Sequence, residues 1–123
     1  MGEKRKFDIE DRLIDYSVRI IRLAAALPKT EVGKHIAGQI LRSGTSPAPN
    51  YGEAQSAESR SDFIHKLKLA LKELRETRTW LKLIARAELV KPASLLAGLL
   101  QETDELLAIL FASVETAKKN RER

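Results

Sequence analysis

One long amphipathic stretch, residues 59–86, constrains the fold of this chain more than any other feature. Ser59 and Asp62 have the spacing of a helix-capping motif just ahead of the apolar run. Apolar or small side chains then recur at alternating steps of four and three, the pattern of a helix that packs along one seam. The members of this seam are Phe63, Leu67, Ala70, Leu74, Thr77, Leu81 and Ile84. The stretch therefore predicts packed helices.

A second line of side chains on the same stretch is cationic, and we call it the basic ridge. On a helical wheel its members fall within about 40° of a common line, away from the seam. The basic ridge consists of Lys68, Lys72, Arg75, Lys82 and Arg86. A solvated outer face is the simpler interpretation of such a line. A contact surface for a polyanion is the alternative, and the formal net charge of +5 permits it.

Three further helices are predicted around this one, in a single domain that covers all 123 residues. The predicted helices span about residues 9–27, 31–57, 60–88 and 92–118. Four helices with short links are typical of an up-down-up-down antiparallel bundle. The predicted fold class is therefore all-α, a four-helix bundle.

The second predicted helix contains an unusual segment, residues 42–57, with the sequence RSGTSPAPNYGEAQSA. Its two glycines and two prolines each weaken a helix. Ser46 followed by Pro47 also matches an N-cap with proline in the first turn, so a helix can restart there. We expect a kink or break within residues 44–49, and a plain loop is the competing interpretation.

The apolar arcs are wider than one bundle needs to bury. The extra apolar residues are Ile14, Val18, Ile21 and Ala25 in the first helix and Leu69, Trp80 and Leu83 in the third. The set in the first helix is predicted to widen its buried arc. Apolar surface of this extent is typical of a contact between copies, so we predict a homo-oligomer. The alternative is that one bundle covers all of it.

Several polar side chains fall close to the apolar arcs, where an unpaired ion would be expensive to desolvate. We expect these residues to form a structural polar network, within or between subunits: Arg42, Asn50, Glu53, Glu73, Glu76 and Arg78. A carboxylate cluster of this kind could instead be an acid–base or metal site.

The sequence argues against enzyme chemistry. It has no cysteine, and its two histidines, His35 and His65, lie on different predicted helices. Neither completes a Glu-x-x-His pair with Glu73 or Glu76. We therefore predict no catalytic residue, no metal site and no cofactor. No apolar run approaches the roughly 18 residues that cross a bilayer, so we expect no membrane association and a cytoplasmic location.

Residues 41–84 resemble the bacterial four-helix bundle family named for the intervening sequences of 23S ribosomal RNA genes. The family pattern is similar to RSGTSxxxNxxEA followed by DFxxKLxxALKExxETxxWL. The chain matches it at Arg42, Ser43, Gly44, Thr45, Ser46, Asn50, Glu53, Ala54, Asp62, Phe63, Lys66, Leu67, Lys72, Glu73, Glu76, Thr77, Trp80 and Leu81. Prolines at positions 47 and 49 depart from the pattern, and they put a continuous second helix in doubt.

The resemblance implies a bundle that assembles into a homopentameric ring. The family is similar to a related branch, the accessory proteins of diversity-generating retroelements. For that branch the resemblance implies a basic pentamer that binds nucleic acid and a reverse transcriptase. For the other members the resemblance implies no particular activity.

Three functions compete on these observations, and a small-ligand or metal-using enzyme at a subunit interface ranks below the other two. One is a nucleic-acid-binding oligomer whose repeated basic ridge contacts phosphates with little base readout. Because aromatic residues make up 5% of the chain, we expect duplex or structured RNA rather than a stacked single strand. The other is a scaffold that recruits a partner protein, through the segment around Asn50 and Tyr51 or through the centre of the ring.

Overall fold

The computed structural model describes residues 8–122, with side chains described for residues 8–120. The helices are α1 (Ile9–Ala26), α2 (Glu31–Thr45), α3 (Pro47–Gln55), α4 (Arg60–Arg86) and α5 (Ala97–Glu122), with a short 3₁₀ helix η1 (Ala93–Leu96) before α5. This part of the chain contains helices and no strands, so the predicted all-α class is confirmed.

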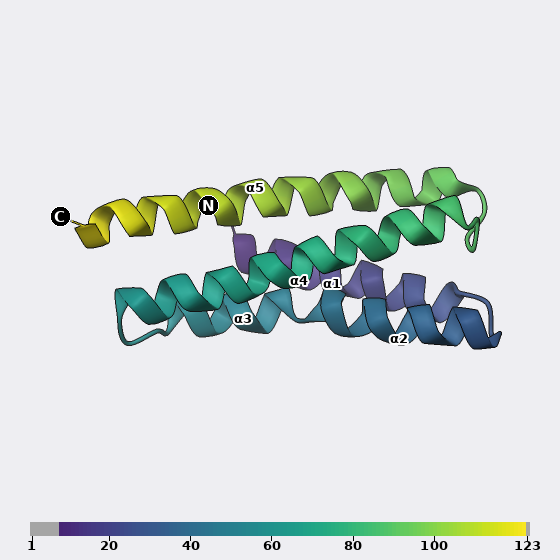
Figure 1. Ribbon diagram of the computed structural model, residues 1–123, viewed down its shortest axis with the longest axis horizontal. Coiled ribbons are helices and arrows are strands. Elements are labelled where there is room, and N and C mark those ends of the chain that lie inside the picture. Colours follow the sequence, from purple (N-terminus) through teal and green to yellow (C-terminus); the bar gives the residue numbers. More distant parts are fainter. Residues whose placement is uncertain (1–7, 123) are drawn as a thin grey trace, which may run out of the picture.

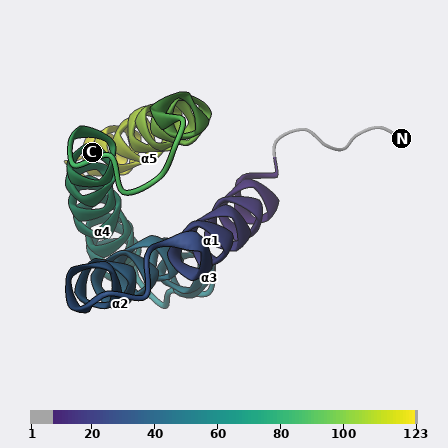
Figure 2. The same cartoon turned by 90° about the vertical axis from the view of Figure 1, so that its right-hand side faces the viewer.

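The helices lie antiparallel along one long axis (Figure 1). The helix α3 follows α2 along the same side of the molecule, so the two together form one rod, and residues 8–122 form four rods. The α4 helix packs on α3 and α5, and α1 packs mainly on α2. Figure 2 shows α1 and α5 on opposite arms of the open arrangement, and they contact each other little. The α4 helix is thus the central element.

Three helices begin at capping residues that the sequence displays. Asp8 accepts a hydrogen bond from the backbone N–H of Asp11 at 3.2 Å and so caps α1. Thr30 caps α2 through the N–H of Gly33 at 3.0 Å. Ser59 caps α4 through the N–H of Asp62 at 3.0 Å. Each cap provides an acceptor for an N–H that has no partner within its helix.

The second rod is interrupted at Ser46, inside the predicted segment 44–49. Pro47 has no N–H to donate to the carbonyl four residues earlier, so the helical hydrogen-bond ladder stops there. Ser46 nevertheless keeps a helical conformation, with φ −74° and ψ −33°. Its hydroxyl donates to the carbonyl oxygen of Arg42 at 2.7 Å. The ladder of backbone hydrogen bonds is therefore interrupted, while the backbone at Ser46 stays helical.

The core follows the predicted seam of α4. Six of its seven predicted members are buried, and Phe63 is partly buried at the edge. Two hydroxyl pairs lie among the apolar side chains: the Thr77 hydroxyl with that of Ser43 at 2.8 Å, and the Tyr16 hydroxyl with that of Thr103 at 2.7 Å. Each pair links two rods and satisfies polar atoms that burial would otherwise leave without partners.

One prediction about α1 is wrong for the single chain. Ile14, Val18, Ile21 and Ala25 do not widen the buried arc, because all four are exposed, the first three by 37–48%. The α1 helix packs by another side, where Tyr16 meets α5 and Ile20 meets Gly44 of α2. Packing on that side leaves the second apolar stripe of α1 facing outward.

Candidate nucleic-acid interface

The basic ridge lies on the outward side of α4. All five of its cations are exposed, and so is Thr79 between them. Lys68 and Arg86 are 18 positions apart in one α-helix, so the ridge extends over about 27 Å at 1.5 Å per residue. Such a straight line of cations can contact several phosphates at once.

The ridge cations differ from several other cations of the bundle, which form ion pairs. Among residues 8–120, none of the five ridge residues forms an ion pair. Other cations do form them: Arg12 with Glu102 at 2.7 Å and Glu105 at 3.0 Å, Lys66 with Glu53 at 2.8 Å, Arg78 with Asp104 at 2.9 Å, and Lys118 with Glu115 at 3.5 Å. The ridge cations therefore lie farther than 4.0 Å from the described carboxylates, although the charge of Lys72 still contributes to lowering the pKa of Glu76.

The predicted polar network forms around Arg42 in one place. Arg42 lies on α2 and donates to the carboxylates of Glu73, at 3.0 Å, and Glu76 on α4. Glu76 also accepts a hydrogen bond from the indole N–H of Trp80 at 3.1 Å. The hydrogen bond from Arg42 is the main reason why the pKa of Glu76 lies below its usual value. These contacts hold α2 against α4.

The other predicted members of that network lie elsewhere. Glu53 pairs with Lys66 across the α3–α4 contact, and Arg78 pairs with Asp104 of α5. Asn50 is half-buried on α3, where its backbone N–H donates to the carbonyl oxygen of Ser46 at 3.2 Å. Five of the six residues are thus distributed over three ion-pair sites, and Asn50 lies at none of them. Their partners on other helices depend on the register between helices, and no sequence spacing signals it.

A second surface, which we call the α1–α2 face, is apolar. It consists of the exposed side chains of Ile14, Val18, Ile21 and Leu41. The last two lie at one level, because the backbone of Gly44 abuts Ile20 and the two helices are antiparallel. Beside them is Gly38, where an added Cβ would meet no atom within 4 Å. Large apolar side chains grouped in this way are typical of interaction surfaces.

The comparison with protein families now identifies the chain. The family model of the 23S rRNA-intervening sequence protein matches residues 5–112. The chain belongs to this family.

A solved structure agrees with the family in fold. The chain is similar to a protein of unknown function from the S23 ribosomal protein family of Bacteroides thetaiotaomicron, with 36% identity and a TM-score of 0.81. The match covers 87% of this chain and 98% of the other. Among curated proteins no match was found. Family membership thus settles the bundle, while the function of the solved relative is unknown.

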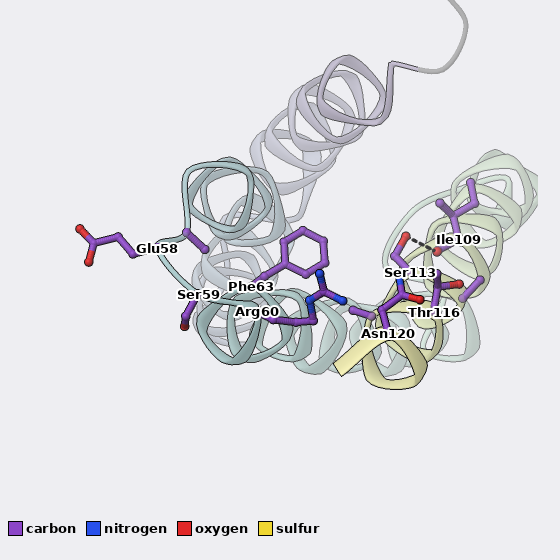
Figure 3. A pocket seen from close by; sticks show the side chains of 11 residues that line it. Glu58, Ser59, Arg60, Phe63, Ile109, Ser113, Thr116 and Asn120 are labelled. Atoms are coloured by element: carbon purple, nitrogen blue, oxygen red, sulfur yellow. Dashed lines mark hydrogen bonds between the residues drawn. The ribbon is translucent and has the colours of Figure 1, made fainter. Parts of the chain in front are cut away.

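This member of the 23S rRNA-intervening sequence family also has an open pocket of about 850 Å³ between the start of α4 and the second half of α5. Phe63 and Ile109 form apolar walls, and Arg60 and Asn120 lie at the rim (Figure 3). The hydroxyl of Ser113 donates to the carbonyl oxygen of Ile109 at 3.2 Å. Glu58, the acidic residue of the lining, points away from the centre. The lining contains no nucleophile with a neighbouring base.

The part of the chain that the structure describes, residues 8–122, lacks two further features. No group of three His, Cys, Asp or Glu side chains there could hold a metal ion. None of the described helices is long and apolar enough to cross a membrane.

Proposed function

We propose that this protein binds the phosphate backbone of nucleic acid through the basic ridge of α4, acting as a homo-oligomer and not as an enzyme. The observation that supports this proposal is the line of five exposed cations, none paired within residues 8–120. Cations held by carboxylates contribute less to phosphate binding, because the competing ion pair must first be broken. Free cations instead release the counterions of the nucleic acid on binding.

The chemistry of the ridge favours backbone contact over base recognition. Lysine and arginine side chains on one helix line can follow successive phosphates. The ridge residues include no Asn or Gln, the side chains that commonly read adenine edges. Binding should therefore depend steeply on salt and weakly on sequence.

We infer that the copies associate through the α1–α2 face. The apolar side chains of this face are exposed in the single chain, so a second copy would remove them from water. Glycine at position 38 lowers helix stability by about 1 kcal/mol compared with alanine. No atom of this chain lies within 4 Å of the position that a Cβ would occupy there, so packing within the chain does not require glycine. A close approach of another copy would explain it. Five copies, as the family resemblance implies, would repeat the ridge in one assembly. We propose a cytoplasmic location for this assembly.

The test is a charge-reversal variant, Lys68→Glu/Lys72→Glu/Arg75→Glu. Its affinity for a labelled 20-base-pair duplex and for a structured RNA should fall at least tenfold at about 50 mM salt, since three phosphate contacts become repulsive. A matched control, Lys29→Glu/Lys91→Glu/Lys119→Glu, makes the same change in net charge at exposed positions away from the ridge. It should retain most of the affinity.

Two other measurements separate the outcomes. Circular dichroism and sedimentation should show that both triple variants keep the fold and the assembly of the unmodified protein. Equal affinity loss in both variants would assign binding to net charge and not to the ridge. Undiminished binding by the ridge variant would exclude the ridge as the contact.

A further inference from the structure

One large aromatic side chain of α5 remains outside the core. Phe111 is 51% exposed, although α5 buries Leu106, Leu110 and Val114 nearby. An exposed phenyl ring on a helix gains nothing from water, so its surroundings decide what it can contact.

The register between α4 and α5 places Phe111 beside the basic ridge. The Arg78–Asp104 pair, 2.9 Å long, fixes one level at which the two helices meet. Seven residues are almost two full turns, so the same side of each helix returns at Leu71 on α4 and at Phe111 on α5. Figure 1 shows that the two helices are antiparallel, so counting seven residues from the Arg78–Asp104 pair puts these two residues at one level.

Two ridge cations flank that level. Lys68 lies three residues before Leu71 and Arg75 four residues after it, and both are on the exposed side of α4 that adjoins α5. Packed helices lie about 8–10 Å apart, so at this register one bound strand can reach the ring and the two cations together. Leu71 itself is buried, whereas Phe111 at the same level of α5 is exposed.

The acidic residues close to Phe111 do not oppose an anion there. Asp104, two turns before it, is paired with Arg78. Glu115, one turn after it, lies 3.5 Å from Lys118. The residue on the adjoining turn toward Asp104 is Ala108, whose small side chain leaves one approach to the ring open. An anionic partner with an aromatic group thus meets complementary chemistry.

We propose that Phe111 stacks on an unpaired base of a nucleic acid strand whose phosphates contact Lys68 and Arg75. The inference rests on the proposed function of the ridge and adds a substrate class to it: strands with unpaired nucleotides. Aromatic side chains stack on any base, because every base has a π-face. A continuous duplex keeps its bases inside the helix and cannot use the ring. Single-stranded segments are therefore preferred over a duplex of the same sequence, which is the opposite of what the low aromatic content of the chain predicts.

The test compares a labelled 20-nucleotide single strand of mixed sequence with its duplex. Phe111→Ala should weaken binding of the single strand about tenfold, the usual effect of losing one stacked base, and change duplex binding less than twofold. Leu95→Ala, which truncates another exposed apolar side chain in η1, should change neither. Phe111→Trp should retain affinity for the single strand. Its added indole emission should be quenched by that strand but not by the duplex.

Each outcome decides at least one of the two proposals. If the unmodified protein binds neither probe, both the proposed function and the stacking proposal are wrong. If the ridge variant loses binding while Phe111→Ala binds both probes normally, the ridge stands and stacking is excluded. If Phe111→Ala instead dissociates the assembly in sedimentation, the ring serves contact between copies, and the stacking proposal is overturned.

Discussion

A buried pair of hydroxyl groups joins α1 to α5 at the level of single residues. The Tyr16 hydroxyl lies 2.7 Å from that of Thr103, which in turn donates to the carbonyl oxygen of Leu99 at 2.8 Å. Because the threonine proton is used there, Tyr16 is the donor in the pair. Burial is the main cause that raises the pKa of Tyr16 to about 12.

This pKa predicts a loss of stability in alkali. A tyrosine of the unfolded chain ionises near pH 10, so between pH 10 and 12 the unfolded state loses its proton first and the free energy of unfolding falls. Below pH 10 the contribution is complete. Tyr16→Phe should be less stable by about 1 kcal/mol at pH 8 and should lack this part of the alkaline decline, which urea titrations across pH 8–12 can measure.

The glycine at position 44 is required by contact between α1 and α2. A Cβ there would lie 2.6 Å from Cγ2 of Ile20, whose side chain is fully buried and cannot move aside. Gly44→Ala should therefore lower the free energy of unfolding by about 1–3 kcal/mol in urea titrations. Gly52→Ala is the matched control, since nothing lies within 4 Å of its Cβ position. It should be stabilising by about 0.5–1 kcal/mol, and equal losses would contradict the packing explanation.

At the level of the element, α4 ends in a Schellman motif that lacks its usual glycine. The N–H of Leu89 donates to the carbonyl oxygen of Ile84, and that of Glu88 donates to Ala85, each at 3.1 Å. Glu88 has φ of 55°, in the left-handed region that is unfavourable for residues with a Cβ. The two hydrogen bonds thus terminate α4 at this point, although glutamate disfavours the left-handed conformation that they require.

Glu88→Gly should raise the free energy of unfolding by up to about 1 kcal/mol, because glycine adopts this conformation without steric cost. Thermal unfolding followed by circular dichroism would measure the change. Glu88→Ala removes the charge but keeps the Cβ, so it should give little of this gain. A gain of similar size in both variants would attribute the effect to charge.

At the scale of the whole molecule, the apolar α1–α2 face predicts that stability depends on protein concentration. If copies associate through it, Tm should rise as concentration increases, since association stabilises the native state by mass action. Val18→Asp places a charge in the face and should abolish this dependence. Gly38→Ala should raise the intrinsic stability of α2 yet weaken association in sedimentation. A fully folded single copy at micromolar concentration in the unmodified protein would refute the face as an interface.

Much of the fold could be predicted because the relevant signals are local. Caps at Asp8, Thr30 and Ser59 act within three residues, and the 3.6-residue period of a helix places the seam and the ridge of α4 on separate sides. The interruption at Ser46 follows from proline, which lacks an N–H. The candidate site was predictable to the extent that it lies on a single helix.

The amino-acid sequence by itself determined the helices, their starts and the line of ridge cations, because each depends on neighbours within a few turns. The tertiary structure alone decided which apolar stripe of α1 is buried, since Ile14, Val18 and Ile21 form as regular a pattern as the stripe that packs. It also decided that Arg78 pairs with Asp104 while the ridge cations form no ion pair within residues 8–120. These relations depend on the register between distant helices, which no local pattern encodes.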